Sequence, residues 1–380
     1  MRLPERSAYG LLTTALGTGL LALGLAFSIQ MIAAVVGPFE LLAPAPEGGA
    51  PGLSVWLPPS ASRDSVFETR RRARSWRAAL GGHVGVREVD SLAALAADGQ
   101  TVLAIGDARW LTDLEVAAVR DFVQRGGAAI ASGAIAVLGP DREPRGTAAM
   151  AELLGVARIA RLEGAVALAA GRRGPLSAGL EPGQRLAVRD EKGFVAVDDA
   201  AAELRWADAR SPERPLEPGP RGASLRRELG AGRLVWLGAG PDLSTAGVMT
   251  PGGDFTRLTA AAFAWAARQP YAEVAAPADL APGDAAAASL DAQLKRLGPR
   301  RHLVEVTNRG GREAQGGTLI VYLNVPVQRV ELHRTILQQD EPRFRFLPGE
   351  QRLEIRLPGL AAGASLAFTL DLDLPEAGRA

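Results

Sequence analysis

The spacing of hydrophobic and polar residues changes along the chain, and each change marks a different kind of structure. A charge-free run extends from Leu11 to Phe39. Short apolar runs then alternate with segments of helical periodicity as far as Pro270, and beyond Tyr271 apolar and polar residues alternate singly. Because side chains repeat every 3.6 residues along a helix and every two along a strand, the pattern predicts a membrane span, an α/β domain and an all-β domain.

The first run is long enough to cross a bilayer, for which about 20 apolar residues suffice. It also exceeds the apolar stretch of about 7 to 15 residues in a cleaved secretory signal, so we expect an uncleaved signal anchor. Arg2 and Arg6 precede the run, whereas the next basic residue after it is Arg63. The positive-inside rule therefore predicts a cytoplasmic N-terminus over residues 1–10, a single transmembrane helix over residues 11–39 and a main body outside the cytoplasm.

Residues 40–52 are rich in Pro and Gly and predict a linker, after which an α/β domain covers residues 53–270. Within this domain the apolar run Thr101–Ile105 predicts a buried strand. Thr112 and Glu115 then have the spacing of a capping box, which starts a helix that ends at a Gly-Gly pair before the strand Ala128–Ser132. Strand, helix and strand joined by short links predict a right-handed crossover and a mostly parallel, flavodoxin-like sheet.

Two further patterns complete the predicted architecture. Residues 157–228 contain short apolar runs separated by Gly, Pro and Asp, which predict an antiparallel extension of the α/β domain. Arg233–Leu237 restores a buried strand, and a helix follows from Asp254. Residues 271–380 contain period-two runs such as Leu353–Leu357, which predict an all-β sandwich.

The chain carries 43 basic and 42 acidic residues, which leaves a net charge of +1. This balance provides no broad field to hold nucleic acid, so we expect no nucleic-acid partner. Three widely spaced histidines and the absence of cysteine predict no metal site. A phosphate-binding loop and a G-x-G-x-x-G after a strand are both missing, so we expect no cofactor. Abundant Ala, Gly, Arg and Pro favour a bacterial source.

Two segments resemble class I glutamine amidotransferase-like domains. Thr101–Gly133 is similar to the core of that family, in which a helix crosses the sheet and a Gly-Gly turn leads into the next strand. Gly230–Ala267 resembles the closing strand and helix. The resemblance implies an amidotransferase-like sheet followed by an immunoglobulin-like sandwich, as in membrane-anchored bacterial envelope proteins.

Enzymes of this family use a Cys nucleophile and a His base, and this chain has no Cys and no His between His83 and His302. The resemblance places the nucleophile turn at Ser132 and thereby implies a pseudoenzyme. Ser132 could replace the cysteine, with Asp107 or Asp242 beyond neighbouring strand ends, but a serine needs a positioned base. A serine-dependent hydrolase or transferase therefore stays open as an alternative.

Other side chains are candidates for binding. Arg70, Arg74 and Arg77 would line one helix face and could hold an anionic glycan, phosphate or lipid headgroups, although such a stripe is more often a solvated face. Trp110 and Trp206 are the tryptophans whose exposure would allow stacking on a sugar, whereas core packing is the usual role of a tryptophan.

These observations predict a non-catalytic binding or scaffolding component of a bacterial cell envelope, anchored in the inner membrane through residues 11–39, with its main body periplasmic or extracellular. Exopolysaccharide export or modification is the expected context, with other envelope or membrane proteins, or an anionic glycan, as partners. An auxiliary subunit of an envelope transporter is a further alternative, because Gly17, Gly19 and Gly24 would permit close helix packing.

Overall fold

In the computed structural model, the described residues are 52–60, 74–80, 84–95, 101–106, 108–139, 143–162, 166–178, 180, 183–188, 194–198, 202–208, 220–241, 254–275, 290–298, 300–327, 329–334, 344–347 and 351–373. The transmembrane helix over residues 11–39 and nearly all of the linker lie outside these residues and stay predictions. Within the described ranges, no helix has the length and hydropathy needed to span a membrane.

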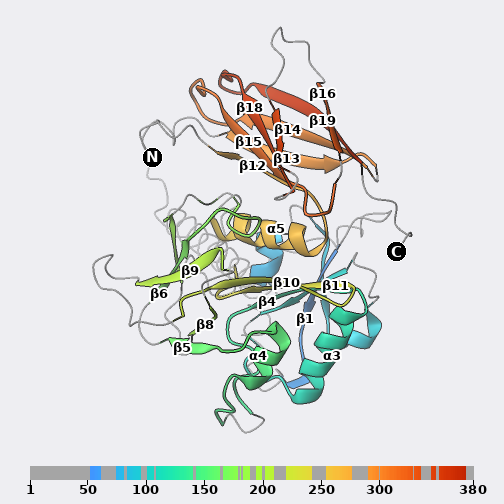
Figure 1. The fold of residues 1–380 in the computed structure, drawn as a ribbon, viewed down its shortest axis with the longest axis vertical. Helices are drawn as coiled ribbons and strands as arrows, with labels where there is room; N and C mark the ends of the chain where they lie inside the picture. The colour runs from blue at the N-terminus through green and yellow to red at the C-terminus, as the bar shows by residue number, and fades with distance from the viewer. Residues whose placement is uncertain are drawn as a thin grey trace, which may run out of the picture. The chain divides into compact units, whose positions relative to one another are not determined.

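A six-stranded sheet forms the centre of the α/β domain, with the strand order β10-β11-β4-β3-β1-β2 (Figure 1). Its strands are β1 (Gly52–Trp56), β2 (Val86–Val89), β3 (Thr101–Ile105), β4 (Ala128–Ser132), β10 (Ser224–Leu229) and β11 (Gly232–Leu237). β2, β1, β3, β4 and β11 are parallel to one another, and β10 pairs antiparallel with β11. The mostly parallel sheet predicted from the sequence is therefore confirmed.

Helices cover both faces of this sheet. α3 (Asp113–Gln124) and α4 (Ala148–Leu154) lie on one face, and α5 (Asp254–Ala266) lies on the other (Figure 1). Alternate residues of β3 serve the two layers: Val102 and Ala104 join the core under α5, whereas Leu103 and Ile105 join the core under α3. Burial on both faces explains why this strand is a continuous apolar run.

The start of α3 confirms the predicted capping box. Thr112 Oγ1 accepts a hydrogen bond from the N–H of Glu115 at 3.2 Å, and the Glu115 carboxylate accepts one from the N–H of Thr112 at 2.7 Å. The same carboxylate accepts a bond from the N–H of Ser60 at 3.1 Å, which links the helix to the segment after β1. Burial on its own would raise the pKa of Glu115, but the hydrogen bonds from Thr112 and Ser60 outweigh it and lower the pKa.

The antiparallel extension is also present. β5 (Ala160–Leu162) pairs with β8 (Phe194–Ala196), and β6 (Val166–Ala170) lies between β7 (Arg185–Ala187) and β9 (Leu204–Asp208). These small sheets supply Leu168, Leu186 and Leu204 to the core under α5. The extension is thus packed against the main sheet and shares its hydrophobic core.

The C-terminal part of the chain is all-β, as predicted. Its strands are β12 (Tyr271–Ala275), β13 (Leu290–Arg296), β14 (Arg301–Asn308), β15 (Gly317–Tyr322), β16 (Arg329–Arg334), β17 (Phe344–Leu347), β18 (Arg352–Leu357) and β19 (Ser365–Asp373). They form two four-stranded antiparallel sheets, β12-β15-β18-β17 and β13-β14-β19-β16. Inward residues of both sheets, among them Val304, Leu319, Ile355 and Phe368, share one core, so the domain is a β-sandwich.

Candidate functional site

Ser132, the candidate nucleophile of the alternative hydrolase, lies inside the protein. Ser132 is the last residue of β4 and is 0% exposed. The turn after it is closed by β11, because the N–H of Gly133 donates to the Leu237 carbonyl at 2.9 Å and Trp236 Nε1 donates to the Gly133 carbonyl at 2.9 Å. Asp107 and Asp242 lie outside the described residues. The structure therefore gives Ser132 no exposed surface at which it could meet a substrate.

The predicted arginine stripe is described only in part, since Arg70 lies outside the described residues. Arg74 and Arg77 belong to a short helix at residues 74–80, where Arg77 Nη2 forms an ion pair with Glu88 Oε1 at 3.5 Å. Both side chains of this pair are about 40% exposed, at 41% and 40%. Such exposed pairs contribute little to stability, and this one is typical of a solvated face.

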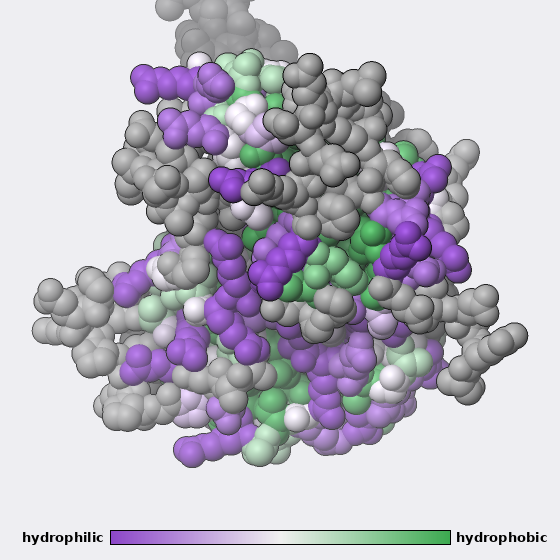
Figure 2. All heavy atoms as spheres, turned by 45° about the horizontal axis from the view of Figure 1, so that its top comes forward, coloured by the Kyte–Doolittle hydropathy of each residue, from purple (hydrophilic) through white to green (hydrophobic). Residues whose placement is uncertain are grey.

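The two tryptophans chosen as stacking candidates are not on open surface. Trp206 is 2% exposed and its Nε1 donates to the Val195 carbonyl at 2.8 Å, so its ring is part of the core. Trp110 is partly buried. The exposed large hydrophobic residues of the described part are Leu114 and Leu297, and Figure 2 shows hydrophilic side chains interspersed with hydrophobic ones over the visible face.

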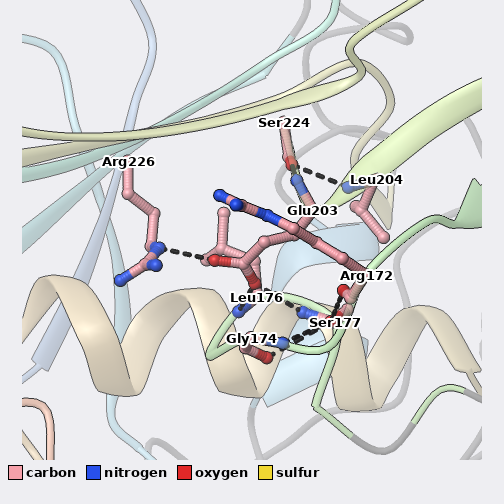
Figure 3. Close-up of polar contacts among 8 residues, drawn as sticks. All are labelled: Arg172, Gly174, Leu176, Ser177, Glu203, Leu204, Ser224 and Arg226. Atoms are coloured by element: carbon pink, nitrogen blue, oxygen red, sulfur yellow. Dashed lines mark hydrogen bonds and ion pairs between the residues drawn. The ribbon is translucent and has the colours of Figure 1, made fainter. Parts of the chain in front are cut away.

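A buried carboxylate forms the centre of a different site. Glu203, immediately before β9, is 2% exposed. Its Oε2 accepts hydrogen bonds from the N–H groups of Leu176, at 2.6 Å, and Ser177, at 3.1 Å (Figure 3). Its own N–H donates to Ser224 Oγ at 3.0 Å, at the start of β10. Glu203 therefore joins the loop after β6, through its carboxylate, to the edge of the main sheet, through its backbone N–H.

The loop after β6 is shaped to bring its N–H groups to this carboxylate. Ser177 Oγ accepts a bond from the N–H of Gly174 at 2.9 Å and donates to the Arg172 carbonyl at 2.7 Å. A Cβ atom at Gly174 would lie 2.3 Å from the Glu203 carboxyl carbon. Because real Cβ atoms do not approach so closely, only glycine fits at this position while Glu203 stays in place.

Arg226 on β10 is the partner of the buried carboxylate. Its Nε lies 2.7 Å from Glu203 Oε1, and its side chain is 31% exposed. Its Cζ lies 5.5 Å from the centre of the Trp265 ring on α5. Among the described residues, the Nη groups of Arg226 make no hydrogen bond. The guanidinium therefore contacts Glu203 through Nε as an ion pair that lacks hydrogen-bond geometry, and its outer nitrogens are left to bind a further acceptor.

The surroundings of Arg226 carry an excess of positive charge. Arg233 on β11 lies over the same Trp265 ring, with Cζ 4.7 Å from its centre. Burial lowers the pKa of the Arg233 guanidinium, and repulsion from Arg268 and Arg226 lowers it further, while Glu228 opposes the change. An anion bound at Arg226 would reduce this repulsion.

The arrangement has the donors to bind a small anionic group. A guanidinium presents parallel N–H donors that match the two oxygens of a carboxylate. No group of three His, Cys, Asp or Glu residues that could hold a metal ion occurs in the described part of the chain. The sequence analysis missed this site because Glu203 and Arg226 belong to no motif and meet only because β9 hydrogen-bonds to the residues that lead into β10.

No protein-family model matches the chain, and no curated protein matches it. Solved structures are similar at low identity. The β-galactosidase from Rahnella sp. R3 is 14% identical with a TM-score of 0.39, and the match covers 84% of this chain and 40% of that one.

Two other structures show the same level of similarity. The α-L-fucosidase isoenzyme 2 from Paenibacillus thiaminolyticus is 16% identical with a TM-score of 0.37, covering 86% of this chain and 49% of that one. A ThuA-like protein from Bacteroides uniformis is 12% identical with a TM-score of 0.38, covering 59% of this chain and 94% of that one. The chain thus spans less than half the length of the two glycosidases.

These comparisons correct the family predicted from sequence. The predicted membership of the class I glutamine amidotransferase-like family was wrong: no protein-family model matches the chain, and two of the three similar structures named above, the β-galactosidase and the α-L-fucosidase, are glycosidases. The physical reason is that strand, helix, Gly-Gly and strand in Thr101–Gly133 specify a crossover in any parallel α/β sheet. The pseudoenzyme and the non-catalytic envelope scaffold were inferred from the loss of that family's residues, and both predictions are withdrawn with it.

Proposed function

We propose that this protein binds acidic carbohydrate and that Arg226 recognises a carboxylate group of the sugar. The observation that carries the proposal is the state of the Arg226 side chain. Its Nε is ion-paired with the buried Glu203, its Nη groups have no other partner among the described residues, and the side chain as a whole is 31% exposed. The planar fork of a guanidinium binds a carboxylate through two parallel hydrogen bonds.

Fixing the guanidinium in advance strengthens such recognition. A mobile arginine side chain carries about 2 kcal/mol of rotamer entropy, much of which it would lose on binding. Here Glu203 and the Trp265 ring already hold the side chain in the free protein. The bound anion therefore meets an ordered donor pair, which is the general benefit of pre-organisation.

Only the names of the similar structures suggest that the ligand is a carbohydrate. Binding of a sugar is therefore tested separately from binding of a carboxylate. Glycoside hydrolysis needs a pair of carboxyl groups that reach the substrate. Glu203 is 2% exposed and accepts two backbone hydrogen bonds, which makes it a structural group rather than such an acid. We accordingly assign substrate recognition to the site and assign bond cleavage to none of the described residues.

Isothermal titration of the full chain with glucuronate and galacturonate oligosaccharides tests the proposal, with the neutral hexose oligosaccharides as the comparison. Arg226→Met should lose the binding, and Arg227→Met is the matched control, because Arg227 is the next residue of β10 and packs beside Gly155. Failure of the wild-type chain to bind uronates would overturn the proposal. Equal binding of acetate and uronates would retain the carboxylate but remove the carbohydrate. Release of nitrophenol from chromogenic uronides and galactosides shows whether the chain also cleaves glycosides.

A further inference from the structure

The β-sandwich touches the partners of Arg226 by two routes, and the first runs through Arg233. This side chain is 7% exposed. Its Nη1 donates to the Trp265 carbonyl in α5 at 2.9 Å and to the Asn324 carbonyl, just after β15, at 2.7 Å. Its Nη2 lies 3.0 Å from Glu228 Oε1. One buried guanidinium thus joins the main sheet, the end of α5 and the sandwich.

The first route ends at the ring beside Arg226. Arg233 and Arg226 both lie over the Trp265 ring, at 4.7 and 5.5 Å from its centre. Asn324 adds a second bond to the same region, since its Nδ2 donates to the Gln269 carbonyl at 2.7 Å, shortly after α5. Docking of the sandwich therefore fixes the end of α5 and, with it, the position of the Trp265 ring.

The second route runs through the loop after β6. Ala178 in this loop packs with Ile320 and Tyr322 of β15 in a small buried cluster that also contains Ala261 of α5. Tyr322 is held in turn by a hydrogen bond from its hydroxyl to Glu273 Oε1 at 3.1 Å. The cluster connects the outer surface of β15 to the loop.

The same loop ends at the carboxylate that holds Arg226. The N–H groups of Leu176 and Ser177 donate to Glu203, whose other oxygen pairs with Arg226 (Figure 3). Ala178 directly follows these donors, so its contact with β15 bears on their position. Two groups orient the Arg226 guanidinium, Trp265 and Glu203. Residues of β15 or just after it therefore help to hold both groups in place.

We infer that the β-sandwich is part of the anion site, with Arg233 and Tyr322 as positioning residues that set the Arg226 guanidinium without touching the ligand. The inference rests on the proposed recognition of a uronic acid at Arg226. It makes binding depend on a domain that contributes no ligand-contacting group. By linkage, a uronate that binds at Arg226 also strengthens the docking of the sandwich.

Binding of a glucuronate oligosaccharide to the full chain, followed by isothermal titration, tests this role. Tyr322→Ala and Arg233→Met should each weaken the affinity at least tenfold while the stoichiometry stays that of the wild type, because the site is misplaced rather than unfolded. Arg233→Lys should recover part of the loss, since an ammonium group can still donate to the two carbonyls. Phe346→Ala is the matched control, because Phe346 on β17 is partly buried against the sandwich core, and it should change the affinity less than twofold.

A second measurement decides the inference even when no uronate binds. Hydrogen exchange at the amides of Leu176 and Ser177 should be at least tenfold faster in Tyr322→Ala than in the wild type, and unchanged in Phe346→Ala. Absence of uronate binding by the wild-type chain together with this faster exchange would remove the proposed function but keep the support of the site by β15. Wild-type affinity and wild-type exchange in Tyr322→Ala, or equal effects in Phe346→Ala, would overturn the inference.

Discussion

Replacement of Glu203 by glutamine removes one charge from the interior and changes little else in shape. The carboxylate accepts hydrogen bonds from Leu176 and Ser177 through one oxygen and pairs with Arg226 through the other. A glutamine side chain has one acceptor oxygen and one amide group. Its oxygen can therefore accept from the loop, as a neutral acceptor without charge assistance, or face Arg226, which leaves the N–H groups of the loop opposite an amide donor.

The loss of unfolding free energy in Glu203→Gln can be estimated from these contacts. A hydrogen bond to a charged group contributes about 1.5–3 kcal/mol to stability. Breaking a fully buried ion pair costs about 3–5 kcal/mol, but Arg226 is 31% exposed and keeps water as a partner, so this part is smaller. We expect Glu203→Gln to lower the free energy of unfolding by about 2–3 kcal/mol at pH 7.

Urea unfolding of the full chain, followed by tryptophan fluorescence, measures this loss. Glu152→Gln is the control, because Glu152 pairs with Arg120 on the surface and its side chain is 64% exposed. Exposed pairs contribute about 0–1 kcal/mol, so the control should lie close to the wild type. A loss in Glu203→Gln no larger than that of the control would refute the account of Glu203 as the group that joins the loop to the sheet.

Two further variants test neighbouring parts of the account. Gly174→Ala should destabilise the chain by about 1–3 kcal/mol, because its Cβ would meet the Glu203 carboxyl carbon at 2.3 Å. Gly311→Ala is the control and should not destabilise the chain, because the space around the added Cβ is open. Thermal unfolding of the two variants measures the difference. Glu115→Gln should be less stable than the wild type at pH 7. Because folding lowers the pKa of Glu115, this difference is complete above the unfolded pKa of about 4.3 and disappears as the pH falls through the lower folded value. Unfolding temperatures at pH 7 and pH 3 measure it, and a difference that grows towards low pH would contradict the reasoning.

Local sequence patterns were sufficient for much of the fold. The strand Thr101–Ile105 and the strand Ala128–Ser132 were predicted at the residues where they occur, because continuous apolar runs identify strands buried on both faces. Thr112 and Glu115 marked the start of α3 because a capping box is a contact between residues close in sequence. Period-two alternation likewise identified the sandwich.

The functional interpretation depended on contacts that no local pattern contains. Glu203 and Arg226 are 23 positions apart by number, and their pairing with the loop after β6 arises only when β6, β9 and β10 pack together. Trp206, which the sequence analysis named as a candidate for stacking on a sugar ring, lies in the core because its strand packs under α5. The family assignment failed because it relied on a crossover pattern that many unrelated α/β domains share.

The central claim is that Arg226, held by Glu203, binds the carboxylate of a sugar. Titration of the wild-type chain, Arg226→Met and Arg227→Met with a glucuronate oligosaccharide tests it most directly. The account predicts saturable binding by the wild type and by Arg227→Met and at least tenfold weaker binding by Arg226→Met. Wild-type affinity in Arg226→Met, or no binding by the wild type, would contradict it.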